Sequence, residues 1–134
     1  MKHLYATFVG LILFLISSGQ SCPGTGNISF QRWNNISGSA VSNLTSNQNY
    51  PNNPSAAGTL TLFEMPTNTG NNIGVRMKGY ICPPTTGNYV FWIASDASGE
   101  LWLSTSSNPA NKIRIAFNTN PTKYKSKPNL IQTN

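Results

Sequence analysis

Hydrophobic and polar residues alternate along several short stretches of the chain, as in strands that bury one face. This alternation predicts strands over residues 27–33, 59–63, 74–81, 100–104 and 112–117. Residues 88–94 are apolar at successive positions, which predicts a central strand covered on both faces, with Trp92 in the core. A tight turn over residues 95–99 is expected to join that strand to the next one as a hairpin.

The connecting segments are rich in Asn, Ser, Gly and Pro, and none shows the 3.6-residue period of a helix. Residues 33–44 are predicted to be a long loop that four apolar side chains pin to the core: Trp33, Ile36, Val41 and Leu44. Residues 43–54 are expected to be irregular. The predicted fold is all-β, a single antiparallel β-sandwich or closely related barrel.

The first 21 residues have the pattern of a secretory signal peptide, expected to be helical. Lys2 precedes a mostly apolar run over residues 4–16, and this run is too short to span a bilayer. Cleavage after Gly19 and cleavage after Ser21 both fit the small-residue rule. We therefore expect a secreted or cell-surface protein whose mature domain is residues 22–134, with no integral membrane segment after cleavage.

The mature chain has few of the side chains that catalysis uses. Its only histidine, His3, lies in the expected signal peptide, so Ser-His or Cys-His nucleophiles and His-ligated zinc are excluded. Glu64 and Glu100 would form a glycosidase pair only if the fold held them across a cleft, and nothing in the sequence places them so. We predict that the protein is not an enzyme and needs no cofactor.

The chain is basic, with nine Lys and Arg against three Asp and Glu and a net charge of +6. Most of these basic residues are spread along the predicted strands, and a cluster occurs only at Lys123–Lys127. Spread charge and export both argue against a nucleic-acid partner. An anionic glycan or a polyanionic cell surface is more compatible with this charge.

Cys22 and Cys82 are the two cysteines of the chain. In an exported protein two cysteines are most simply a disulfide pair, which we predict here. Cys22 directly follows one of the two cleavage points, so lipid attachment at Cys22 is an alternative. The preceding residues, Gly19-Gln20-Ser21, match the bacterial lipidation pattern poorly because its Leu is missing.

Five segments occur in a specific order and spacing: Trp33-x-x-Ile36-x-Gly38-x-x-Val41-x-x-Leu44, Tyr50-Pro51-x-x-Pro54, Arg76-x-x-Gly79-Tyr80-Ile81, Pro84-x-Thr86-Gly87-x-Tyr89-x-Phe91-Trp92-Ile93-Ala94-Ser95-Asp96, and Glu100-Leu101-Trp102-Leu103-Ser104. Together they resemble the PA14 domain, a β-sandwich module of adhesins and glycan-processing enzymes. The resemblance implies a carbohydrate-binding module without catalysis of its own. The alternative is a structural or adhesion fragment of a larger surface protein or glycan-processing enzyme.

Two departures from the family pattern bear on function. Calcium-dependent members resemble one another in an Asp-Asp pair after the Phe-Trp strand, whereas this chain has Asp96 followed by Ala97. The resemblance therefore implies weak Ca²⁺ binding or none. Family members also generally continue with further strands beyond the region matching residues 124–133, so we expect a domain that lacks its last strands. Further domains of a longer protein are then expected partners.

Two residues are candidates for contact with a ligand. Asp96 is a candidate metal or sugar ligand, and its alternative role is to shape the turn, as Asp commonly does. Trp102 is a candidate platform for a sugar ring, and its alternative role is to fill the core beside Leu101 and Leu103. For Trp92 the core is favoured by the apolar run around it, and a sugar platform is the alternative.

Overall fold

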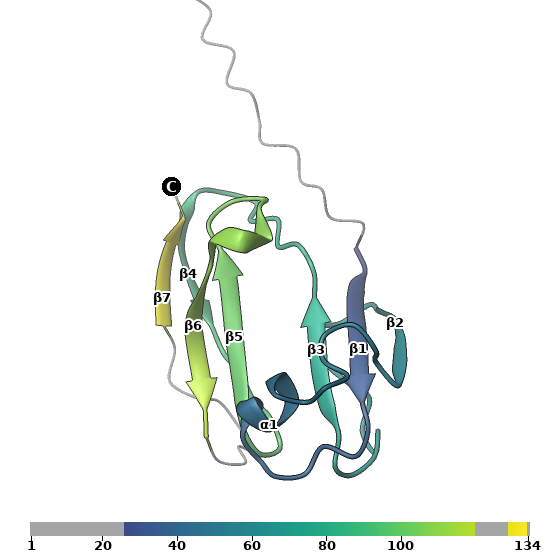
Figure 1. Ribbon diagram of the computed structural model, residues 1–134. Helices are drawn as coiled ribbons and strands as arrows, with labels where there is room; N and C mark the ends of the chain where they lie inside the picture. The colour runs from purple at the N-terminus through teal and green to yellow at the C-terminus, as the bar shows by residue number, and fades with distance from the viewer. Residues whose placement is uncertain (1–25, 120–128, 134) are drawn as a thin grey trace, which may run out of the picture.

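The computed structural model describes residues 26–119 and 129–133. Its elements are β1 (Ile28–Trp33), α1 (Val41–Thr45), β2 (Ala56–Leu60), β3 (Gly74–Lys78), β4 (Gly87–Phe91), β5 (Gly99–Ser104), a 3₁₀ turn (Pro109–Asn111), β6 (Lys112–Asn118) and β7 (Asn129–Thr133). Every paired strand runs antiparallel to its neighbour, so the predicted all-β antiparallel fold is confirmed (Figure 1). The expected signal peptide, Cys22 and the Lys123–Lys127 cluster lie outside the described residues.

The strands form three small sheets. One has the order β2-β1-β3, and the others are the pairs β4-β7 and β5-β6. Figure 1 shows the first sheet on one side of the molecule and the two pairs on the other, with α1 near the lower end between them. Strands β6 and β7 are in contact, which brings the two pairs together. The arrangement is the sandwich-like one that the sequence predicts.

The best-buried side chain is Trp33, which is 1% exposed at the end of β1. It packs with Ile36 and Leu44, and the partly buried Tyr50 lies against this cluster. The indole Nε1 of Trp33 donates a hydrogen bond to the backbone oxygen of Asn49 at 3.0 Å, so its polar atom is satisfied. Trp33, Ile36 and Leu44 thus pin residues 33–44 to the core, as predicted.

The predicted loop over residues 33–44 overlaps a short helix that the sequence pattern did not indicate. Helix α1 has five residues, too few to display a helical period. Asn43 accepts a hydrogen bond from the backbone N–H of Ala40 at 2.9 Å, which fixes the first turn. The helix carries the buried Leu44 towards β3, where Gly74 leaves space for it. A Cβ at Gly74 would lie 2.7 Å from Leu44 Cδ1.

The predicted strand over residues 59–63 is displaced towards the N-terminus, because β2 ends at Leu60. The small residues at the start of β2 were not recognised as strand residues. Gly58 pairs with Phe30 of β1, and the Phe30 ring covers its Cα, where a Cβ would lie 2.8 Å from Phe30 Cε1. The close approach of the ring to the backbone explains why small residues suit this strand.

Two predictions about residues 88–104 are wrong. The expected hairpin does not form, because β4 pairs with β7 and β5 pairs with β6. Strand β4 also alternates between partly buried and exposed residues, as a strand with one covered face does. Trp92 lies one residue beyond β4 and is 49% exposed, so it does not fill the core.

The predicted disulfide stays a prediction, because Cys82 lies between β3 and β4 while Cys22 is outside the described residues. We expect freshly purified exported protein to resist alkylation until it is reduced, and then to gain two adducts per chain by intact-mass measurement. Free thiols in the unreduced protein would contradict the pairing. A diacylglycerol adduct on Cys22 would support the lipid-anchored alternative instead.

Candidate functional site

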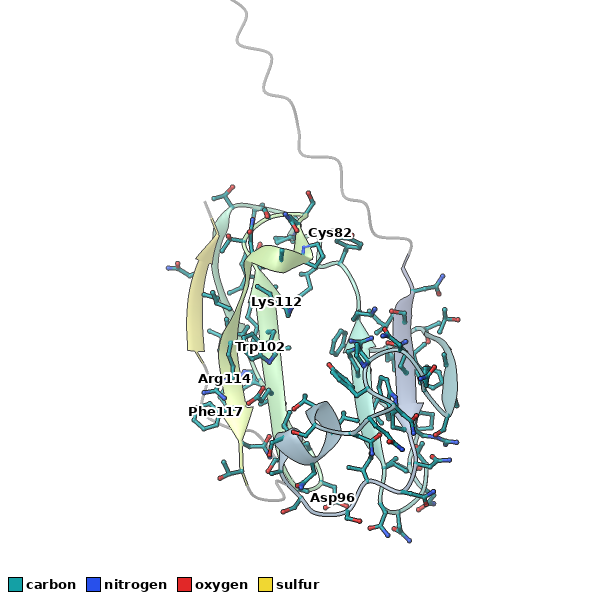
Figure 2. The ribbon with its side chains drawn as sticks, viewed as in Figure 1. Cys82, Asp96, Trp102, Lys112, Arg114 and Phe117 are labelled. Carbon is teal, nitrogen blue, oxygen red and sulfur yellow. The ribbon has the colours of Figure 1, made fainter. Side chains whose placement is uncertain are left out.

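Strands β5 and β6 present one face with aromatic and charged side chains (Figure 2). Glu100, Trp102 and Ser104 share this face of β5, because alternate residues of a strand project the same way. The antiparallel register sets three residues of β6 opposite them. The six residues, called the β5–β6 face below, are Glu100, Trp102, Ser104, Lys112, Arg114 and Phe117.

A β-bulge is what brings the β6 residues to one face. The register pairs Leu101 with Ala116 and Trp102 with Arg114, which leaves Ile115 as the extra residue of β6. Ile115 and Ala116 are both buried, 4% and 2% exposed, although they are adjacent in sequence. Without the extra residue Arg114 and Phe117, three positions apart, would lie on opposite faces. The bulge therefore aims both outwards.

Hydrogen bonds fix the aromatic ring at the centre of this face. Trp102 is 47% exposed, yet its indole Nε1 donates to Glu100 Oε2 at 3.0 Å. Arg114 Nη1 donates to the other carboxylate oxygen, Oε1, at 2.6 Å. The Arg114 guanidinium in turn lies 4.6 Å from the ring centroid of Phe117, a cation–π contact. The indole is thus accessible to solvent and held in one orientation.

The loop that carries Asp96 is anchored by hydrogen bonds to a residue of β6, while Asp96 itself is exposed. Asn118, which is 9% exposed, donates from Nδ2 to the carbonyl of Ala97 at 2.9 Å. The Ser95 hydroxyl lies 3.0 Å from Asn118 Oδ1 and 3.2 Å from the same carbonyl. Gly99 closes the loop where a Cβ would lie 2.7 Å from Ser95 Oγ. The loop is therefore held largely by Asn118 of β6.

These hydrogen bonds leave few oxygen atoms in the loop that could coordinate calcium. Ca²⁺ binds six to eight oxygens, but the Ala97 carbonyl and the Ser95 hydroxyl are already engaged. The Ser98 hydroxyl donates to the backbone oxygen of Thr119 at 3.3 Å. In the part of the chain that the structure describes, no three His, Cys, Asp or Glu side chains gather as metal ligands. Weak Ca²⁺ binding or none at Asp96 therefore stays the prediction.

We expect calorimetry to detect no Ca²⁺ binding tighter than about 10⁻⁴ M, the weak end for extracellular modules. Ala97 has φ = 74°, a left-handed conformation that Asp tolerates better than Ala, so Ala97→Asp is not expected to strain the loop. This variant adds the second carboxylate and should bind Ca²⁺ more tightly than the unchanged chain. Micromolar binding by the unchanged chain that Asp96→Ala abolishes would contradict this expectation.

The two candidate ligand residues do not lie together. Figure 2 places Asp96 at the lower end of the molecule, in the loop before β5, whereas Trp102 lies further up that strand. Trp102 is on the exposed surface, so its predicted alternative as a core residue is wrong. Regular alternation along residues 112–117 predicts Phe117 on the inner face, away from Lys112 and Arg114, so these three residues do not stand out as one site in the sequence. The adjacent apolar pair Ile115-Ala116 is the signal that could have revealed the bulge.

The two carboxylates considered for glycoside hydrolysis also lie apart in the fold. Glu64 follows β2 in the three-stranded sheet and lines a shallow surface pocket with residues 60–67. Glu100 is on β5, in a different sheet, and accepts hydrogen bonds from Trp102 and Arg114. Such a pair would have to face each other across one cleft to act on a glycosidic bond. Glu64 lies in the irregular segment after β2 and Glu100 on β5, and this placement gives no support to that chemistry.

Comparison with known proteins identifies the fold family. The family model of the PA14 domain matches residues 23–107. The chain belongs to the PA14 domain family. The three β5 residues of the β5–β6 face all lie inside this match, whereas β6 follows it in the sequence.

The curated relatives are much longer proteins. A mouse (Mus musculus) N-acetyl-beta-glucosaminyl-glycoprotein 4-beta-N-acetylgalactosaminyltransferase 1 is 32% identical over 92 residues, which are 69% of this chain and 9% of the relative. Fibrocystin from mouse and from dog (Canis lupus familiaris) is 36% identical over 47 residues, 35% of this chain and 1% of each relative. No solved structure matches the chain. This PA14 domain therefore spans a small part of each relative.

No helix in the described part of the chain is long and apolar enough to cross a membrane.

Proposed function

We propose that this PA14 domain is a secreted or cell-surface module that binds glycans through the β5–β6 face and catalyses no reaction. The single observation that carries the proposal is the Trp102 indole, exposed on an open sheet face and fixed by Glu100. A sugar ring has an apolar C–H face and a rim of hydroxyl groups. A flat aromatic ring held in one orientation can stack on the C–H face of a sugar, and little side-chain entropy is lost when it does.

Charged groups beside the ring suit the hydroxyl groups of a sugar. The Glu100 carboxylate is an acceptor and the Arg114 guanidinium is a donor, and both lie next to Trp102. Arg114 uses Nη1 towards Glu100, and its side chain remains 44% exposed, so other N–H groups of the fork are accessible. A ligand hydroxyl would thus meet both a donor and an acceptor at the edge of the ring.

Absence of catalysis is part of this proposal, and it is supported by the placement of the acids. The matched mouse transferase acts on a glycoprotein according to its name, but the matching segment is 9% of its length. A domain that small is consistent with a binding module next to a separate catalytic part. The Glu100 carboxylate accepts hydrogen bonds from Trp102 and Arg114 on this face. These contacts account for a glutamate at this position without a catalytic role.

A second candidate is a structural or adhesion segment of a larger surface protein. It is favoured by large apolar side chains that are exposed away from the β5–β6 face, among them Leu62, Phe63, Tyr80 and Ile81. Exposed apolar side chains of this size are usual where another protein surface packs. A neighbouring domain of a longer chain would cover them.

A glycan array probed with the folded, tagged domain separates the two candidates. We expect retention of at least one glycan class, unchanged when EDTA replaces Ca²⁺, because Ala97 leaves the turn with the single carboxylate of Asp96. Cooperative thermal unfolding of the same sample shows that the domain is folded. Folded protein that retains no glycan at high concentration would overturn the proposal and favour the structural candidate.

A further inference from the structure

The charges on the β5–β6 face point to a narrower class of ligand than the proposed function names, and this step rests on that function. We infer that the face takes a linear anionic polysaccharide. Sugar rings would stack on Trp102, while carboxylate or sulfate groups of the same polymer would pair with Lys112 and Arg114. Asp96 takes no part in this binding.

The face carries an excess of positive charge. Its basic residues are Lys112 and Arg114, and its acid is Glu100. Both oxygens of Glu100 already accept hydrogen bonds, from Trp102 and from Arg114. Among residues 26–119, no carboxylate forms an ion pair with the exposed Lys112. The ammonium group of Lys112 is therefore available to an external anion.

The two cations lie on the same side of β6. They are two positions apart on one strand, which sets their Cα atoms about 6.6 Å apart along β6 at roughly 3.3 Å per residue. The register sets Trp102 directly opposite Arg114, and Ser104 opposite Lys112. Figure 2 shows Lys112, Trp102 and Arg114 near one another on the two strands. A polymer that carries acid groups beside its apolar ring faces would meet both kinds of side chain.

The face is open and elongated rather than a closed pocket. Lys112 and Phe117 lie opposite Ser104 and Glu100, which are four residue steps apart on β5, about 13 Å along an extended strand. The side chains of Trp102 and Phe117 are about half exposed at 47% and 54%, so neither is sunk into a cavity. An open, elongated surface can bind along the length of a polysaccharide, whereas the terminal sugar of a short glycan usually enters a pocket.

Charge also decides between an anionic and a neutral polymer. A neutral glycan would use the aromatic rings but would leave the Lys112 ammonium without a partner. An anionic polymer is attracted by the excess of Lys and Arg over Asp and Glu before contact and can pair with Arg114 through its planar fork. Carboxylate and sulfate share this chemistry, so the experiment includes one polymer of each kind.

The test compares Lys112→Ala with Lys78→Ala, an exposed lysine on β3 in the other sheet, which removes the same charge elsewhere. Affinities are measured for a polyuronate, a sulfated glycosaminoglycan and a neutral β-glucan of similar length. We expect Lys112→Ala to weaken anionic binding about tenfold, as loss of one charge-assisted contact does. It should weaken anionic binding more than neutral binding, and Lys78→Ala should alter either affinity less than about twofold.

The outcomes separate this inference from the proposed function. Stronger binding of one anionic polymer than of the other assigns the acid group. Equal losses in the two lysine variants would overturn the inference in favour of nonspecific charge attraction. Neutral binding as tight as anionic binding would overturn it as well, while the proposed function would stand. Failure of the folded domain to bind any of the three polymers would overturn both.

Discussion

Replacing Trp33 by alanine is expected to lower the free energy of unfolding by about 3–5 kcal/mol, the usual cost of truncating a buried Trp. Trp33 is 1% exposed and is the central member of the cluster with Ile36 and Leu44. The substitution leaves a cavity and removes the donor of the Asn49 hydrogen bond. It also removes the ring over which the Arg76 guanidinium lies, 5.7 Å from the centroid.

A loss of this size is a large part of the 5–15 kcal/mol that stabilises an ordinary domain. Urea denaturation followed by circular dichroism measures it, and Trp92→Ala is the matched control. Trp92 is 49% exposed, so its truncation should cost well under half as much. Equal effects of the two substitutions would show that the Trp33 cluster is not the core of this domain.

Replacing Trp102 by alanine is expected to weaken glycan binding about 30-fold, because truncating a central aromatic contact typically costs about 2 kcal/mol. The free energy of unfolding should change little, since the side chain is 47% exposed. This combination distinguishes a binding residue from a core residue. Isothermal titration with the glycan selected on the array measures the affinity, and urea denaturation measures the stability.

Two further variants show what the indole contributes. Trp102→Phe keeps an aromatic ring but loses the hydrogen bond to Glu100, so an intermediate affinity is expected. Trp92→Ala removes an indole of similar exposure that follows β4 and is not among the six residues of the β5–β6 face, and it should leave the affinity within about twofold. If Trp92→Ala weakened binding as much as Trp102→Ala, the β5–β6 face would not be the glycan site.

Much of the fold follows from local pattern. Strands β1, β3, β5 and β6 fall within or close to the predicted ranges because each alternates apolar and polar residues. The pairing of the strands does not follow in the same way. Alternation indicates which face of a strand is buried but not which other strand pairs with it. β4 and β5 are separated by a turn that permits a hairpin, yet β4 pairs with β7, far along the chain. Long-range pairing of this kind depends on tertiary packing.

The candidate site was predictable only in part. The sequence makes Trp102 a candidate for either sugar contact or core packing. Its exposure in the fold rules out the core. Arg114 and Phe117 join it only through the extra residue Ile115 in β6. A bulge of one residue reverses the face of everything after it, and an alternating pattern gives no warning of that reversal.

The most direct test of glycan binding at the β5–β6 face is an NMR titration of the unmodified protein. The chain has three tryptophans, so its indole N–H signals are few, and Trp92→Phe and Trp102→Phe assign them. As glycan is added, the Trp102 signal is expected to shift and saturate, while the signal of the buried Trp33 stays in place. A titration that moves the Asp96 loop or Trp92 and leaves the Trp102 indole unchanged would contradict this account.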